Sequence, residues 1–193
     1  MFPILVDIKA RKIVLAGEGD ALEKRLALLD ETRPDALTVV AAAPSAALRA
    51  RAGDRLLDRA AVAADFEGAA LVFLAGLPDA VSEPLAAAAR AAGALVNCED
   101  RPAWCDFHVP AMVRRGDLIL TVSTGGRSPG LARWIRRRLE GLFGPDWAER
   151  LDHAAERRTC WRAEGLPLDE LGRRTEDLIR QQGWQPRKEG LIP

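Results

Sequence analysis

The chain has 193 residues, of which 48% are apolar and 29% are charged, and its formal net charge is zero. This length suits one globular domain with a smaller appendage and a sizeable core. The neutral balance argues against a nucleic-acid partner, since proteins of that class usually carry a basic excess. No apolar run reaches the roughly 18 residues needed to span a bilayer, and Asp7 and Lys9 interrupt any signal-peptide core. We therefore expect a cytoplasmic protein with no membrane partner.

The chain has an odd number of cysteines, and we expect it to be cytoplasmic; they are Cys98, Cys105 and Cys160. Structural disulfides are not expected, because they are rare in the cytoplasm. Cys98, Cys105 and His108 lie close in sequence, but their spacing matches no usual zinc pattern. We expect no metal site.

The first apolar run, at 12–16, is rich in β-branched residues and ends at the glycine turn Gly17–Gly19. A helical pattern follows, with Leu22, Leu26 and Leu29 on one face. Strand, glycine turn and helix together are typical of a site where a pyrophosphate binds at a helix N-terminus. The Rossmann fingerprint asks for a small residue where Leu22 stands. The turn alone therefore leaves an ordinary strand-to-helix turn as the alternative.

Four further apolar runs predict strands, at 36–41, 55–57, 69–75 and 94–97. Helical patterns separate most of them, and this alternation implies parallel β-α-β units. We predict an α/β fold with a Rossmann-like, mostly parallel sheet. Sheets that bind NAD often carry an acid at the end of the second strand for the ribose hydroxyls, and this chain has Ala41–Ala43 there. This position does not indicate which cofactor is bound.

The pattern changes after Pro110. A strand is predicted at 117–123, and the residues before it, 114–117, are predicted to be a turn rather than a crossover helix. Ser128 is expected to cap a helix at 129–142, whose first residue is a proline.

Two more helical patterns follow at about 146–164 and 168–182, and the tail from Gly183 is expected to be loose. We predict three parts: a nucleotide-binding domain at 1–110, a small segment at 111–143, and a helical domain with a loose tail at 144–193.

The run at 95–102 ends a predicted strand in a polar turn that contains Glu99 and Asp100 and closes at Pro102. Ligands of open α/β sheets bind beyond the carboxyl ends of the strands. Asp100 is therefore a candidate for a ligand site. The alternative is a loop acid that accepts hydrogen bonds from backbone amides.

Seven stretches, in order, resemble the precorrin-2 dehydrogenases of siroheme synthesis, some of which are also sirohydrochlorin ferrochelatases. The resemblance is to the stand-alone form or to the amino-terminal module of siroheme synthase, and it covers nearly all of residues 1–143. The stretches are 1–5, 14–19 with Lys24 and Arg25, 95–102, 105–107, 109–111, 114–118 and 123–129.

The resemblance implies that NAD⁺ accepts a hydride while precorrin-2 is oxidised to sirohydrochlorin. Fe²⁺ would be only a substrate, inserted into sirohydrochlorin by members that chelate. Asp100 matches the family's catalytic acid, and Arg101 stands where the family pattern has a second acid. The implied cofactor-binding residues are Gly17, Glu18, Gly19, Asp20, Ala21, Ala42, Ala43 and Gly76.

The implied substrate carries eight carboxylates, which the bidentate fork of arginine suits. The alternative is that the arginines named below simply form a solvated helix or loop surface. Arg101 would either bind a substrate carboxylate or act on the charge of Asp100. The resemblance also implies a homodimer that pairs through 111–143. The expected substrate-binding residues are Asn97, Arg101, Arg114, Arg115, Ser123, Thr124, Arg127 and Arg133.

Two other hypotheses stay open. Glu18, Leu22 and Leu77 depart from the family pattern, so the chain is alternatively a non-catalytic tetrapyrrole- or nucleotide-binding carrier or sensor module. A third hypothesis is an unrelated Rossmann dehydrogenase that acts on a small neutral substrate.

Overall fold

The computed structural model describes residues 2–184, so the tail expected to be loose lies, from residue 185 on, outside the described residues. The chain divides into two units, Met1–His108 and Val109–Pro193. Within residues 2–184, no helix is long and apolar enough to cross a membrane.

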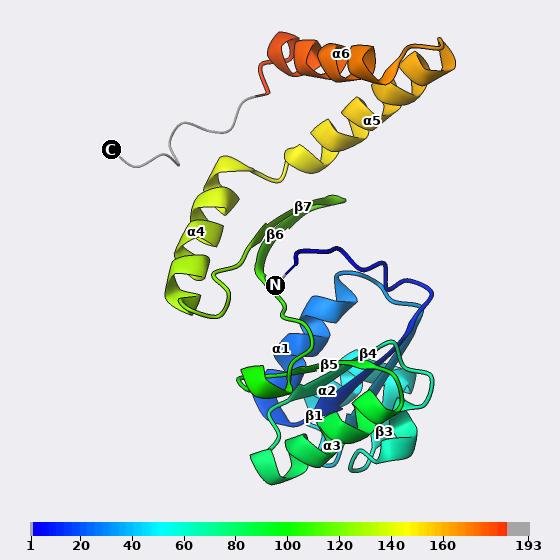
Figure 1. Ribbon diagram of the computed structural model, residues 1–193, viewed down its shortest axis with the longest axis vertical. Coiled ribbons are helices and arrows are strands. Elements are labelled where there is room, and N and C mark those ends of the chain that lie inside the picture. The colour runs from blue at the N-terminus through cyan, green and yellow to red at the C-terminus, as the bar shows by residue number, and fades with distance from the viewer. Residues whose placement is uncertain (1, 185–193) are drawn as a thin grey trace. The chain divides into compact units, whose positions relative to one another are not determined.

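The first unit contains a five-stranded sheet with the strand order β3-β2-β1-β4-β5 (Figure 1). Every pairing in it is parallel, so the predicted Rossmann-like α/β fold is confirmed. From β1 the chain builds outward on one side to β3, then returns to place β4 on the other side of β1. The strand order therefore reverses between β1 and β4, which is where such sheets bind nucleotides. The strands are β1 (Lys12–Gly17), β2 (Ala36–Ala41), β3 (Leu56–Asp58), β4 (Leu71–Ala75) and β5 (Leu95–Cys98).

Three α-helices connect these strands: α1 (Gly19–Asp30), α2 (Ala46–Ala52) and α3 (Asp79–Ala91). Helix α1 buries Leu22, Leu26 and Leu29, as its pattern predicts. Leu22 is fully buried, so the residue that departs from the Rossmann fingerprint belongs to the core.

The two faces of the sheet differ near β5. Val72 and Leu74 of β4 pack in one core cluster with Ala86 and Ala89 of α3. Because side chains alternate along a strand, Phe73 faces the opposite side of the sheet. There its ring lies under the guanidinium of Arg25 from α1, 5.5 Å from the ring centroid. Asn97 of β5 is in register with Phe73, so it lies on the same side of the sheet as α1.

The second unit begins with an antiparallel hairpin of β6 (Ala111–Arg115) and β7 (Leu118–Val122). The prediction of a turn at 114–117 was wrong for its first two residues, which lie in β6. They form a strand because they pair with β7, and only residues 116–117 make the turn. Gly116 at this turn has a φ of 57°, a left-handed conformation that glycine adopts without strain.

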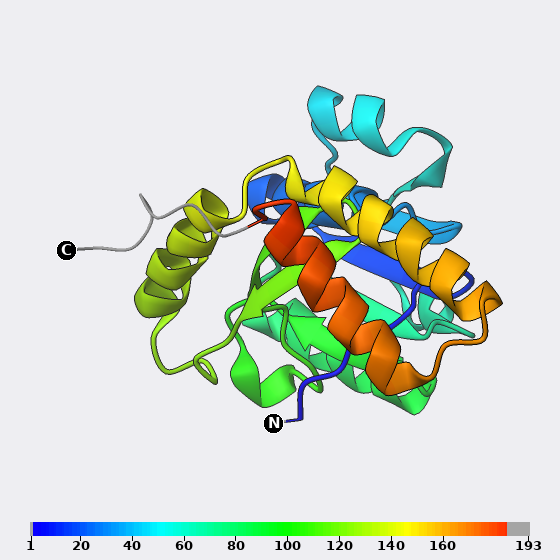
Figure 2. The same cartoon turned by 90° about the horizontal axis from the view of Figure 1, so that it is seen from above.

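Three helices complete the second unit: α4 (Pro129–Leu142), α5 (Trp147–Ala163) and α6 (Leu168–Gln181). Helix α4 packs on both strands of the hairpin. Helices α5 and α6 lie side by side (Figure 2) around a small core of Trp161, Leu171 and Leu178.

Candidate functional site

The turns after β1 and β4 touch each other at the point where the strand order reverses. A Cβ added to Gly17 would lie 2.0 Å from the carbonyl oxygen of Ala75, and the amide of Glu18 donates to that oxygen at 3.0 Å. Gly76 has a φ of 72°, and a Cβ there would lie 2.3 Å from the carbonyl oxygen of Glu18. Only glycine allows this approach at both positions, so the backbones of the two turns are in direct contact where the strand order reverses.

The N-terminus of α1 follows directly after the first of these two turns. Glu18 is the N-cap residue, but its side chain makes no capping hydrogen bond. Glu18, Gly19 and Asp20 are exposed, and Gly19 has a φ of 61°. The first amides of a helix have no partner within the helix and attract anions. The turn therefore fits a pyrophosphate, and the predicted residues of the glycine turn and Gly76 are brought together here.

The turn after β2 lies beside the first one, since β2 is the neighbour of β1. Ala42 and Ala43 are exposed in it. Ser45 caps α2 by accepting a hydrogen bond from the amide of Leu48 at 2.9 Å. The hydroxyl of Ser45 also donates to Oε1 of Glu23, a residue of α1, at 2.6 Å. An acid that is absent from the end of β2 in the sequence is thus present beside it in space.

Asp100 follows Glu99 in the turn after β5 and is exposed. Its φ is 58°, in the left-handed region that residues other than glycine rarely adopt. The turn is anchored on both sides, since the amide of Glu99 donates to the carbonyl of Leu74 at 2.9 Å. On the other side, the Cys105 thiol donates to the carbonyl of Cys98 at 3.0 Å and accepts from its amide at 3.2 Å. The predicted catalytic acid therefore sits on a fixed, strained turn at the carboxyl end of the sheet.

Asn97, predicted to bind substrate, is 6% exposed. Its side-chain amide donates to the carbonyl of Phe107 at 2.9 Å. Phe107 in turn meets the ring of Phe73 edge-on, with centroids 5.3 Å apart. Asn97 therefore orders the segment that returns past the Asp100 turn.

Arg101 pairs with Asp79, the first residue of α3, and its Nε donates to Oδ1 of that carboxylate at 2.7 Å. The hydrogen bond to Asp79 raises the pKa of Arg101. A second donor of the guanidinium binds the backbone carbonyl of Asp100 at 3.0 Å. Arg101 thus joins the Asp100 turn to the start of α3, just beyond Gly76.

Arg25 was not among the predicted site residues. Its guanidinium lies on Phe73, and within residues 2–184 it makes no hydrogen bond or ion pair. Burial lowers the pKa of Arg25, and the nearby Glu99 and Cys105 act to raise it. The only sequence signal was its place in the pair Lys24-Arg25. A half-buried cation beside the Asp100 turn is suited to binding a carboxylate.

The remaining predicted substrate residues belong to the second unit. Ser128 caps α4 by accepting from the amide of Leu131 at 3.3 Å, which confirms the predicted cap. Thr124 exchanges hydrogen bonds with the backbone of Ser128, at 3.1 and 3.2 Å, and the hydroxyl of Ser123 accepts from the amide of Gly125. These hydroxyls shape the loop before α4.

The four arginines of this unit that were predicted to bind substrate differ in what they contact. Arg115 donates to the carbonyls of Phe143 and Glu140 and so caps the end of α4. Nε of Arg114 is buried and has no hydrogen-bond partner within the described part of the chain. Arg127 and Arg133 are exposed.

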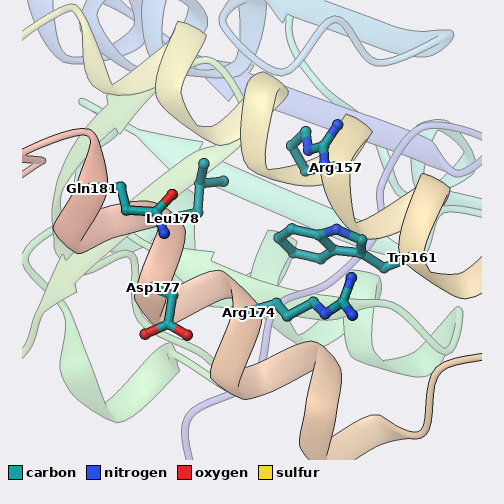
Figure 3. A pocket seen from close by; sticks show the side chains of 6 residues that line it. All are labelled: Arg157, Trp161, Arg174, Asp177, Leu178 and Gln181. Carbon is teal, nitrogen blue, oxygen red and sulfur yellow. The ribbon is translucent and has the colours of Figure 1, made fainter.

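A hollow of about 240 Å³ lies between α5 and α6 (Figure 3). None of the predicted site residues lines it. Arg157 covers the Trp161 ring at 5.5 Å, and Arg174 pairs with Glu170. Among the described residues, no group of three His, Cys, Asp or Glu side chains lies together as a metal would require. The lining residues are Arg157, Trp161, Arg174, Asp177, Leu178 and Gln181.

Comparison with protein families gives two matches. The family described as Putative NAD(P)-binding matches residues 4–111. The family described as Sirohaem biosynthesis protein central matches residues 115–142.

Several curated relatives are siroheme synthases. That of Methylococcus capsulatus is 38% identical over 141 residues, which cover 72% of this chain and 30% of the relative. That of Ectopseudomonas mendocina is 34% identical over 180 residues, which cover 93% of this chain and 35% of the relative. The chain thus spans about a third of the length of the curated relatives it matches.

Among solved structures, SirC, a precorrin-2 dehydrogenase, matches with a TM-score of 0.73 and 22% sequence identity. The match covers 93% of this chain and 89% of that chain. This likeness shows that the two chains share a fold.

Proposed function

This chain belongs to the putative NAD(P)-binding family and is related to the siroheme synthases, and on that basis we propose that it oxidises precorrin-2 to sirohydrochlorin with NAD⁺. The observation that carries the proposal is the place of Asp100. It is exposed at the end of β5, the neighbour of β4, whose own end carries the glycine of the cofactor turn.

The oxidation removes two electrons and two protons from precorrin-2. One hydride ion leaves the macrocycle, and bound NAD⁺ supplies the site that accepts it. The second hydrogen leaves as a proton, which the carboxylate of Asp100 accepts and passes to water. NADH, a proton and sirohydrochlorin are therefore the products, and the atoms and charges balance.

The proposed cofactor contacts come from the turns at the carboxyl ends of β1, β2 and β4. The amides at the start of α1 would bind the pyrophosphate, and Gly17 and Gly76 would leave room for it, because a Cβ at either position would meet backbone. Ala42 and Ala43 lie at the adenosine end. These residues fit a dinucleotide.

The carboxylates of the substrate would bind arginines that are not already paired with an acid of the protein. Arg127 and Arg133 are exposed, and Arg25 lies beside the Asp100 turn without an ion pair among the described residues. We include Arg114 in this set because its Nε has no partner in the described part of the chain. Arg115 and Arg101 would contribute chiefly by holding α4 and the Asp100 turn in place.

A homodimer that pairs through residues 111–143 is part of the proposal. Leu131 and Trp134 of α4 support it, since they are 49% and 48% exposed, and apolar side chains of this size are common in interfaces between copies. Sedimentation or light scattering of the purified protein would give the mass. The cytoplasmic location expected from the sequence stays a prediction.

The test is an NADH assay with purified protein, precorrin-2 and NAD⁺. We expect NADH and the absorbance of sirohydrochlorin to rise together, one for one. Tight binding of sirohydrochlorin without NAD⁺ binding would instead favour a carrier or sensor. An iron-insertion assay without NAD⁺ decides separately whether the chain also inserts Fe²⁺, as a substrate, into sirohydrochlorin.

A further inference from the structure

Nucleotide-binding sheets that prefer NAD⁺ usually present a carboxylate at the end of β2, where it accepts hydrogen bonds from the adenosine ribose. This chain has alanines there, and Ala42 and Ala43 are exposed. The ribose hydroxyls would meet no side-chain acceptor on β2 itself. A carboxylate does reach this turn, but it comes from α1.

That carboxylate belongs to Glu23. Its Oε1 accepts a hydrogen bond of 2.6 Å from Ser45, in the turn after β2. Ser45 is itself fixed, because the same hydroxyl caps α2 by accepting from the amide of Leu48. Glu23 is half-buried, so its position is set by α1 on one side and by Ser45 on the other. The second carboxylate oxygen, Oε2, has no hydrogen-bond or ion-pair partner within residues 2–184.

Arg49 is the first cation of α2 after Ser45, and it is engaged elsewhere because it pairs with Asp58 at 2.7 Å. NADP⁺ would bring a 2′-phosphate to this position, which calls for a free cation rather than a carboxylate. The local charge therefore opposes the phosphate and suits hydroxyl groups.

We propose that Glu23, held by Ser45, replaces the acid missing from the end of β2, accepts hydrogen bonds from the adenosine ribose of NAD⁺, and discriminates against NADP⁺. This inference rests on the proposed function only in that the chain must bind a dinucleotide. It names Glu23 as a residue that determines cofactor specificity.

Calorimetric titration of the full chain with NAD⁺ and with NADP⁺ tests this without any tetrapyrrole. We expect the chain to bind NAD⁺ at least about ten-fold more tightly than NADP⁺, as the loss of a hydrogen bond to a charged group would predict. Glu23→Gln should reduce that ratio by about ten-fold, because it removes the charge and keeps the shape. Ser45→Ala should reduce it by less, because the carboxylate remains but loses its anchor.

Glu31→Gln is the matched control, since Glu31 is exposed just after the same helix and its loss changes the net charge equally. It should leave the ratio unchanged, and the circular dichroism melting curve of each variant should show a folded protein. A ratio that Glu23→Gln does not alter, or wild-type binding of the two nucleotides with equal affinity, would overturn this inference and leave the proposed reaction standing. Failure of the wild type to bind either nucleotide would overturn both.

Discussion

Arg101 donates to Asp79 across the end of the sheet, with Nε 2.7 Å from Oδ1 of the carboxylate. The family pattern has an acid where this chain has Arg101, and an acid there would repel Asp79. The arginine instead ties the turn of Asp100 to the first turn of α3. The guanidinium is engaged by Asp79 and by the carbonyl of Asp100, so we propose that Arg101 acts by holding this turn.

Breaking this pair should affect the rate more than stability. Both side chains are roughly half exposed, so the pair is expected to contribute little to the free energy of unfolding. Asp79→Asn and Arg101→Gln should each lower kcat several-fold through a looser Asp100 turn. The double variant Asp79→Asn with Arg101→Gln should lose little more than either single variant, as a double-mutant cycle of kcat would measure. Independent, additive losses would show that the pair does not position Asp100.

Arg25 is expected to bind a carboxylate of the substrate. Arg25→Gln should raise the KM for precorrin-2 by about ten-fold and leave the KM for NAD⁺ nearly unchanged, because a charge-assisted hydrogen bond is lost. Arg25→Lys should keep part of the affinity. Lys24→Gln is the control, since Lys24 is the exposed neighbour on the same helix. Equal KM values for Arg25→Gln and Lys24→Gln would show that Arg25 serves only the packing on Phe73.

The two glycine positions Gly17 and Gly93 should respond differently to alanine. A Cβ at Gly17 would lie 2.0 Å from a backbone oxygen, whereas a Cβ at Gly93 would meet nothing within 4 Å. Gly93 has a φ of 84°, so alanine there should cost about 1 kcal/mol of backbone strain. Gly17→Ala should cost more, about 2–3 kcal/mol, because the two turns must separate. Urea unfolding curves would compare the two, and equal midpoints would contradict the close approach.

Asp30 gives the first unit part of its resistance to acid. Burial acts to raise the pKa of Asp30, but hydrogen bonds from Arg55 and Arg51 outweigh it, and the pKa is lowered. A carboxyl group with a lowered folded pKa stabilises the fold above its unfolded pKa of about 3.9, and the effect is lost as pH falls through the folded value. Asp30→Asn should therefore reduce stability at pH 7 by up to about 1 kcal/mol. As pH falls below the unfolded pKa and through the lowered folded pKa of Asp30, the melting temperature of this variant should approach that of the wild type.

Periodicity predicts much of this fold because the buried faces are local in sequence. Leu22, Leu26 and Leu29 lie on one face of α1 as expected, and each predicted strand of the parallel sheet is found within two residues of its expected bounds. The strand β6 was missed because its sequence is half polar and only its pairing with β7 makes it a strand.

The site was predicted less completely than the fold, for a physical reason. The glycine turn and Asp100 carry their signal in consecutive residues. The other three residues depend on partners far away in the sequence. Glu23 contacts Ser45 and Asp79 contacts Arg101, each 22 residues away. Arg25 of α1 lies on the ring of Phe73 in β4. Such contacts depend on the packing of α1 and α3 against the sheet, which no local pattern encodes.

The most direct measurement compares kcat for NADH formation from precorrin-2 in the wild type, Asp100→Asn and Glu99→Gln. Glu99 is the adjacent acid, so its amide variant controls for loss of charge in the same turn. We expect Asp100→Asn to lower kcat by about 10²–10⁴-fold, the usual contribution of a general base, with unchanged NAD⁺ affinity. Glu99→Gln should lose far less. A wild type that forms no NADH, or an Asp100→Asn variant as fast as the wild type, would contradict the proposed dehydrogenase with Asp100 as its base.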